Sequence, residues 1–168
     1  TMLYIYKVSR LEDFQAFYEL KCQKDAVAWS GFATAPNEDR LREYFVNKIL
    51  KNDKTYVFYL RDTEIPDETC IGYQQFDLNE DGVVDMRGTV IRRKYQGLGY
   101  YDEIRILVED EIARLGGKTI ISWCSELNLA SMNGAEDLGW HKTNEFNVVN
   151  LPKLGGDHKF YKWIKEIK

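Results

Sequence analysis

The stretch from Val83 to Cys124 places a β-rich run, a glycine turn, an amphipathic helix and a second β-rich run in immediate succession. Gly116 and Gly117 follow the helix, whose one apolar face is formed by Ile104, Leu107, Val108, Ile112 and Leu115. A helix that joins two parallel strands crosses over the sheet and begins at the carboxyl end of the first strand. Open α/β sheets bind ligands at that edge, so this stretch predicts a fold class and the place of a site.

Hydrophobic periodicity predicts the other elements. We expect strands at 3–8, 54–62, 69–78, 83–93, 118–124, 140–149 and 158–166. We expect helices at 11–24, from 38 to about 49, from about 100 to 115 and at 128–138, with 25–36 irregular. The apolar run 118–124 is typical of a strand buried on both faces. The order predicts an α/β (α+β) fold, a mixed, mostly antiparallel, twisted sheet of about six to seven strands flanked by four helices.

Composition limits the classes of protein. The chain of 168 residues fits a single domain, residues 1–168, and its 44% hydrophobic content can fill a core. A net charge of −4 argues against nucleic acid or an anionic membrane as the partner, and no apolar run has the length of a membrane span. We therefore expect a cytoplasmic protein with no nucleic-acid and no membrane partner.

The cysteines and histidines give no sign of a disulfide framework or a metal site. Cys22, Cys70 and Cys124 are odd in number and have no CxxC spacing, which favours reduced thiols. His141 and His158 lie in late strands without metal-like spacing, so no metal is expected.

The glycine turn before the third predicted helix favours an anion. Backbone N–H groups at the start of a helix lack internal partners, and the helix dipole adds positive potential there. Gly97 and Gly99 have no Cβ, so a diphosphate can approach the chain, and Arg92, Arg93 and Lys94 add charge at the rim. The turn is neither a P-loop nor a complete GxGxxG motif. The alternative interpretation is an ordinary tight turn.

The stretch from Gln96 to Tyr101 resembles the acyl-CoA-binding motif Q/R-x-x-G-x-G/A of the GNAT superfamily of N-acyltransferases, and Ile91 stands where that family's strand carries its valine. The resemblance implies an acyl-CoA N-acyltransferase domain with acetyl-CoA as acyl donor. It implies that the strand backbone pairs with the pantetheine arm and that the turn amides hold the pyrophosphate. The implied cofactor-binding residues are Thr89, Val90, Ile91, Gln96, Gly97, Leu98, Gly99, Tyr100, Tyr101 and Asp102.

A second stretch, "NLASMNGAEDLGW", is similar to the family element N-x-x-A/S-x-x-x-Y-x-x-x-G-F/W. Asn128, Ser131, Gly139 and Trp140 occupy matching positions. In the family the asparagine holds the pantetheine or the loop beside it, which adds Asn128 and Ser131 to the implied cofactor site. The last strand, 158–164, resembles the family's closing strand.

The sequence departs from the family motifs at two positions that concern the acyl donor, acetyl-CoA. Tyr101 replaces the last Gly/Ala of the first motif, and its ring can stack on the cofactor, crowd it or turn outward. Ala135 stands where many members have the tyrosine that protonates the departing thiolate. The sequence permits Ser131, Asn133, Tyr100 or a bound water as a substitute, and a thiolate is a tolerable leaving group without one.

A third departure concerns the general base. Trp123 lies where some members carry a glutamate. Asp85 is the first choice and Glu126 the second for a carboxylate that removes a proton from the acceptor ammonium, directly or through water. The alternative for Asp85 is a solvated strand residue paired with Arg87 or Arg93.

The predicted acceptor site involves aromatic residues. Trp29 and Phe32 lie in a predicted loop, where large rings have less structural need, and with Trp123 they are the candidates for substrate binding. Core packing is the alternative role. Cys124 as an acyl-carrying nucleophile is disfavoured, since buried thiols are usually inert.

The resulting hypothesis is an N-acetyltransferase that moves an acetyl group from acetyl-CoA to a primary amine of a small molecule by direct attack in a ternary complex. The alternatives are a catalytically degenerate CoA-binding or ligand-sensing protein of the same fold, and a structural domain that binds no CoA. The acceptor stays open among amino sugars, aminoglycosides, polyamines, amino acids and protein N-termini. A homodimer is common in the family.

Overall fold

The computed structural model describes residues 2–51, 53–66, 69–128, 132 and 134–167. Within them, seven strands form one sheet in the order β1-β2-β3-β4-β5-β7-β6. The strands are β1 (Leu3–Lys7), β2 (Thr55–Asp62), β3 (Gly72–Leu78), β4 (Val83–Ile91), β5 (Thr119–Ser125), β6 (Trp140–Asn150) and β7 (Asp157–Glu166). All neighbours are antiparallel except β4 and β5, which confirms the mixed, mostly antiparallel sheet.

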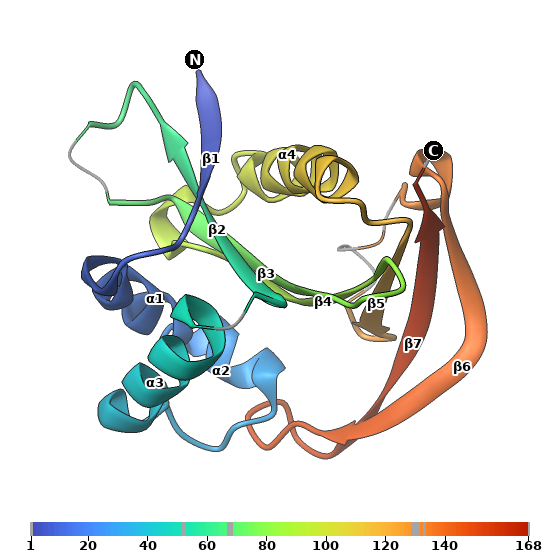
Figure 1. Ribbon diagram of the computed structural model, residues 1–168. Coiled ribbons are helices and arrows are strands. Elements are labelled where there is room, and N and C mark those ends of the chain that lie inside the picture. Colours follow the sequence, from blue (N-terminus) through green and yellow to red (C-terminus); the bar gives the residue numbers. More distant parts are fainter. Residues whose placement is uncertain (1, 52, 67–68, 129–131, 133, 168) are drawn as a thin grey trace.

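Helices cover both faces of the sheet. The helices α1 (Phe14–Lys21), α2 (Lys24–Ser30) and α3 (Glu38–Tyr44) lie on one face, and α4 (Tyr100–Arg114) lies on the other (Figure 1). Because side chains alternate along a strand, β2 serves both layers. Its even-numbered Phe58 and Leu60 join the core layer under α4, and its odd-numbered Val57 and Tyr59 join the layer under α1. Among the described residues, no helix combines the length and the apolar character that crossing a membrane requires.

The segment 25–36 is not irregular throughout, as the sequence predicted, because residues 24–30 form α2. The first helix correspondingly ends at Lys21 rather than at 24, and Gln23 is extended between the two helices. Gly31 ends α2 with φ 83°, a conformation in which glycine carries no steric penalty. Val27 is the one residue of α2 that is buried, so the helix leaves almost no periodic signal in the sequence.

The helix predicted at 128–138 is wrong over its described part. The helical conformation there is 3-10 and not α: Met132 and the short turn Glu136–Leu138 have it, and Gly139 ends that turn with φ 95°. Gly134 has φ 75°, which an α-helix does not accommodate. Residues 129–131 and 133 lie outside the described residues.

The strands β4 and β5 separate along their length. They pair only from Val83–Asp85 to Thr119–Ile121. Past that point β4 has a bulge opposite the Gln75/Phe76 step of β3, and Gly88 next to it has φ 144°. A bulge bends its strand and increases the local twist. Among the described residues, the carboxyl-terminal half of β4 has no strand partner on its β5 side.

β5 is not buried on both faces, which corrects the prediction for 118–124. Ile120 is fully buried under α4, whereas the side chain of Trp123 on the opposite face is 36% exposed. The core layer under α1 and α3 contains no described residue of β5, so nothing in that layer covers Trp123.

Candidate active site

The loop between β4 and α4 is held in place from its base. The side-chain amide of Gln96 donates to the carbonyl oxygen of Ile91 and to Oδ2 of Asp25, each at 3.0 Å. The amide of Gln23 also donates to the Ile91 carbonyl, at 3.0 Å. Gln96 therefore ties the loop to the end of β4 and to α2.

The peptide groups after Gln96 form an open cradle of donors. Gly97 and Gly99 have φ of 78° and 88°, and a Cβ placed on either would meet no atom within 4 Å. The first backbone hydrogen bond of the helix runs from the Glu103 N–H to the Gly99 carbonyl. In the described part of the chain, the N–H groups of residues 97–102 have no acceptor. Six donors at the positive end of a 15-residue helix suit an anion.

Arg92 does not serve the cradle as the sequence predicted. Its guanidinium pairs with Glu19 at 3.0 Å and donates through Nε to the Cys70 carbonyl at 2.7 Å. It thereby braces α1 against the end of β4. Arg93 is exposed beside the cradle.

The free edge of β4 offers further backbone groups. The Arg92 N–H donates to the Ile71 carbonyl next to β3. Because the direction of the backbone groups alternates along a strand, the N–H and carbonyl groups of Val90 also face β3. Thr89 and Ile91 therefore direct theirs to the opposite edge, where β5 has separated. The Ile91 carbonyl oxygen already accepts hydrogen bonds from the side-chain amides of Gln23 and Gln96. The peptide groups of Thr89 are placed to pair with an extended ligand.

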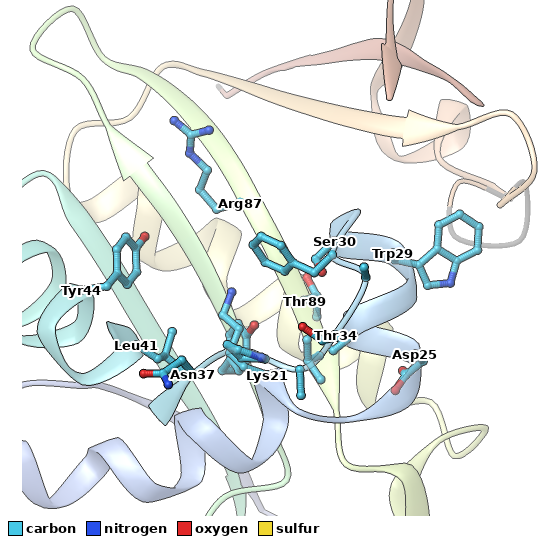
Figure 2. Close-up of a pocket in the computed structure, with 18 of the residues that line it drawn as sticks. Lys21, Asp25, Trp29, Ser30, Thr34, Asn37, Leu41, Tyr44, Arg87 and Thr89 are labelled. Carbon is cyan, nitrogen blue, oxygen red and sulfur yellow. The ribbon is translucent and has the colours of Figure 1, made fainter. Parts of the chain in front are cut away.

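A cavity of about 940 Å³ lies between this edge of β4 and the first three helices (Figure 2). Its wall includes Thr89 and Val90 from β4 and Asn128 after β5. It also includes Trp29 and Phe32, two of the three predicted acceptor-binding residues. Trp29 belongs to α2, not to a loop, and Phe32 is 57% exposed in the segment that follows. Trp123 is not part of this wall.

Tyr101 points into the fold and not outward. Its half-buried ring packs against the core layer under α4, with the Arg105 guanidinium 5.5 Å from the ring centre, and it reaches the cavity wall. Burial raises the pKa of the Tyr101 hydroxyl above its ordinary value, so the group stays protonated at neutral pH. The space over Gly97 and Gly99 is left open.

Tyr100 makes structural contacts and does not line the cavity. Its hydroxyl donates to Oδ2 of Asp62 at the end of β2, at 3.1 Å, and its ring lies edge-on against Tyr95. Of the other substitutes considered for the missing tyrosine, Ser131 and Asn133 lie outside the described residues. Ala135 itself is buried in the core layer under α4.

Neither predicted base lies in the cavity wall. Asp85 accepts a hydrogen bond from Asn79 at 3.1 Å, near the point where β4 and β5 still pair. Glu126 is exposed after β5, and its N–H donates to the Lys159 carbonyl. Arg87, considered as a partner of Asp85, pairs instead with Asp77 at 2.9 Å.

Sequence reasoning missed several residues of the cavity wall, and these are Lys21, Asp25, Arg40, Tyr44, Tyr73 and Arg87. Lys21 gave a usable signal, since it follows Phe14 and Phe17 at helical spacing and so extends the buried face of α1. The others depend on how helices dock on the sheet, which local sequence does not encode.

A family model described as "Acetyltransferase (GNAT) domain" matches residues 3–141, most of the chain. The chain belongs to the GNAT acetyltransferase family. The GNAT match ends within β6, so it contains the cradle, both separating strands and α4. No curated protein matches the chain significantly.

Solved structures share the GNAT fold at low identity. Spermidine N-acetyltransferase from Vibrio cholerae, in complex with CoA and spermine, is 16% identical with a TM-score of 0.81, covering 98% of this chain and 95% of that one. The aminoglycoside acetyltransferase AAC(6')-Ib, in complex with ribostamycin and coenzyme A, is 15% identical with a TM-score of 0.73, covering 99% and 94%. A ribosomal-protein alanine N-acetyltransferase from Escherichia coli is 14% identical with a TM-score of 0.74, covering 99% and 95%.

Proposed function

We propose that this GNAT protein transfers the acetyl group of acetyl-CoA to the primary amine of a small molecule, by direct attack in a ternary complex. The observation that carries the proposal is the cradle, in which six consecutive N–H groups have no acceptor in the described part of the chain. The space over Gly97 and Gly99 is open to a diphosphate. The similar spermidine and aminoglycoside acetyltransferases are described with coenzyme A bound.

The remaining donor contacts follow from the same geometry. The peptide groups of Thr89 face the gap between β4 and β5, where they pair with the amides of the pantetheine arm. The Ile91 N–H faces the same gap and polarises the thioester carbonyl. Asn128, in the cavity wall across the gap, holds the arm from the β5 side. These backbone groups are fixed before the substrate arrives, which is what makes them effective for a developing oxyanion.

The reaction needs three proton movements. The acceptor ammonium loses one proton to give the free amine, and the amine nitrogen then forms a bond to the acetyl carbon. That nitrogen loses a second proton as the carbon–sulfur bond breaks, and the released thiolate takes up a proton. Asp85 and Glu126 stay the proposed bases. Because neither lies in the cavity wall, water relays the proton to them.

Tyr101 donates to the departing thiolate. The hydroxyl is protonated at neutral pH, its ring reaches the cavity wall, and it lies near Cys124 on the other side of the gap. It thus supplies, from the start of α4, the proton that a tyrosine at the position of Ala135 would supply. This role would explain why a tyrosine, and not a glycine or alanine, stands at the last position of the motif.

Two measurements test the proposal in sequence. Acetyl-CoA is added to the whole chain in a thermal-shift assay, where binding to the folded state raises Tm by mass action. Release of CoA thiol is then followed with a panel of amines. A Tm increase with amine-dependent thiol release supports the enzyme. A Tm increase without release by any amine favours a binding protein of the same fold, and no increase refutes the CoA site.

A further inference from the structure

The acceptor end of the cavity is basic in an acidic protein. A smaller hollow of about 360 Å³ adjoins the main cavity, and both include Lys21, Tyr44 and Arg87 in their walls. Together the walls carry five cations against two carboxylates: Lys21, Arg40, Lys48, Lys54 and Arg87 against Asp25 and Asp77. The chain as a whole has a net charge of −4, so the excess of positive charge is local.

Both carboxylates already have partners in the protein. Asp77 pairs with Arg87 at 2.9 Å and accepts from the Thr55 hydroxyl at 2.8 Å. Asp25 accepts from Gln96 at 3.0 Å and lies toward the opposite end of the cavity from Tyr44 and Arg87 (Figure 2). Asp77 is therefore already paired with a cation, whereas Asp25, which is bonded to neutral amides, is the carboxylate of the two that can meet the ammonium of an acceptor. A polycationic acceptor would face like charge here, which disfavours its binding.

The ammonium of Lys21 has no carboxylate partner among the described residues. Its Nζ lies over two aromatic rings, 5.3 Å from the centre of Phe17 and 5.4 Å from that of Tyr73. Burial lowers the pKa of this amine from 10.5 to about 8, so the ammonium is poorly solvated. A buried cation is costly unless an opposite charge compensates it, and here the cavity is where that charge can come from.

Lys21 also lies near the reacting edge. The Tyr73 ring beneath it belongs to β3, and Tyr73 is the direct cross-strand neighbour of Val90 on β4. Facing residues of two strands are about 5 Å apart. An anion at Lys21 therefore lies above the strand that neighbours β4, in the same cavity wall as Thr89 and Val90 of β4.

We infer that the acceptor is a small primary amine that also carries an anionic group, a carboxylate or a phosphate, and that Lys21 binds this group. The inference rests on the proposed function and narrows its substrate class. It excludes polyamines and aminoglycosides, the compound classes named with two of the similar structures.

The test compares matched amines at saturating acetyl-CoA. Phosphoethanolamine is paired with ethanolamine, and phenylalanine with phenethylamine, so each pair differs only in the anion. Spermidine represents the polycations. We expect the member of at least one pair that carries the carboxylate or phosphate to have a kcat/KM higher than that of its counterpart without the anionic group. The expected difference is about tenfold to a hundredfold, the value of one charge-assisted contact. Which pair responds distinguishes carboxylate from phosphate.

Variants then assign the effect to Lys21. We expect Lys21→Met to remove the preference by raising KM for the amine that carries the anionic group to about that of its matched counterpart. We expect Lys21→Arg to retain most of the preference, because arginine keeps the charge. Lys142, whose ammonium lies 4.0 Å from the Tyr161 ring centre on another part of the sheet, gives the control variant Lys142→Met. Thermal shift with CoA and each amine shows whether a variant still folds and binds.

Three results overturn the inference. One is a higher kcat/KM for spermidine or for the amines without an anionic group, a result that leaves the acetyltransferase proposal standing. Another is a decrease in kcat/KM of Lys21→Met that is equally large for every acceptor amine. The third is inactivity of Lys21→Arg as severe as that of Lys21→Met, which assigns Lys21 to proton transfer instead. Absence of any stabilisation by acetyl-CoA refutes the proposed function and this inference together.

Discussion

The side-chain amide of Gln96 donates to the carbonyl oxygen of Ile91 at 3.0 Å, so the loop that ends β4 is tied back to the strand it leaves. The same amide reaches Asp25 on α2 at 3.0 Å. The Gln96 side chain thus links the edge of β4, the proposed donor cradle and Asp25 in the wall of the cavity. The glutamine of the sequence motif has a positioning role that needs no contact with the phosphates.

Replacing Gln96 with alanine is expected to weaken donor binding. The change removes two hydrogen bonds, each worth about 1 kcal/mol, and the cradle loses its link to α2. We expect KM for acetyl-CoA to rise by roughly fivefold to tenfold with kcat changed by less than about threefold. Steady-state kinetics with varied acetyl-CoA checks this. Gln15→Ala, which removes an exposed bond to Glu19 at 3.3 Å, is the control and should leave KM unchanged.

Gly97→Ala is expected to combine backbone strain with loss of donor affinity. Gly97 has φ 78°, and an L-residue in this conformation costs about 1 kcal/mol. Gly155 has φ 76° and equally open surroundings, but it lies in the turn between β6 and β7. Urea unfolding should show similar destabilisation for Gly97→Ala and Gly155→Ala. Calorimetric titration with CoA should show weaker binding, by about tenfold, for Gly97→Ala alone, since its methyl group enters the cradle. Equal CoA affinity in both variants would contradict the cradle.

Tyr100 and Tyr101 are adjacent, and we expect their substitution to have different effects: one on stability and the other on kcat. Tyr101→Phe removes the proposed proton donor, so we expect kcat to fall by roughly tenfold to a hundredfold with little change in either KM. Tyr100→Phe removes the bond to Asp62 and should lower stability by about 1 kcal/mol while kcat is retained. Single-turnover thiol release at saturating substrates measures the difference. Comparable kcat in the two variants would remove Tyr101 from the mechanism.

The backbone conformation of the proposed donor cradle leaves a clearer signal in the sequence than the shape of the proposed acceptor cavity does, for a physical reason. Gly97 and Gly99 are required by local backbone conformation, and the stripe through Ile104, Val108 and Ile112 is required by one helix face. Both signals are contained within about twenty consecutive residues.

The acceptor side depends on contacts between distant segments. α2 buries Val27 alone, so its short sequence has no periodic pattern to detect. Lys21 becomes a cavity residue only because α1 docks over Tyr73, and the separation of β4 from β5 follows a bulge opposite Gln75. Propensity and spacing report none of these relationships, which belong to the tertiary structure.

Lys21 is also expected to make stability depend on pH. Its pKa is about 8 in the folded protein against 10.5 for an ordinary lysine, so between these values the unfolded chain binds more protons. Stability therefore rises with pH across this interval as the cost of the buried charge is relieved. At pH 7 the cost is fully present, and a shift of this size corresponds to about 1–3 kcal/mol after allowance for partial exposure.

Lys21→Met removes that cost, so its advantage over the parent protein should be largest at pH 7 and should shrink as the pH approaches 10. Urea unfolding at pH 7, 8.5 and 9.5 measures the difference between the two proteins. Burial raises the pKa of Tyr6 to about 12 in both proteins, so this tyrosine changes their stabilities with pH by the same amount. Its contribution, like that of the other buried tyrosines, therefore drops out when the two free energies of unfolding are subtracted. A Lys21→Met difference that does not change with pH would mean that the ammonium is well solvated, and it would remove the reason for expecting an anion beside it.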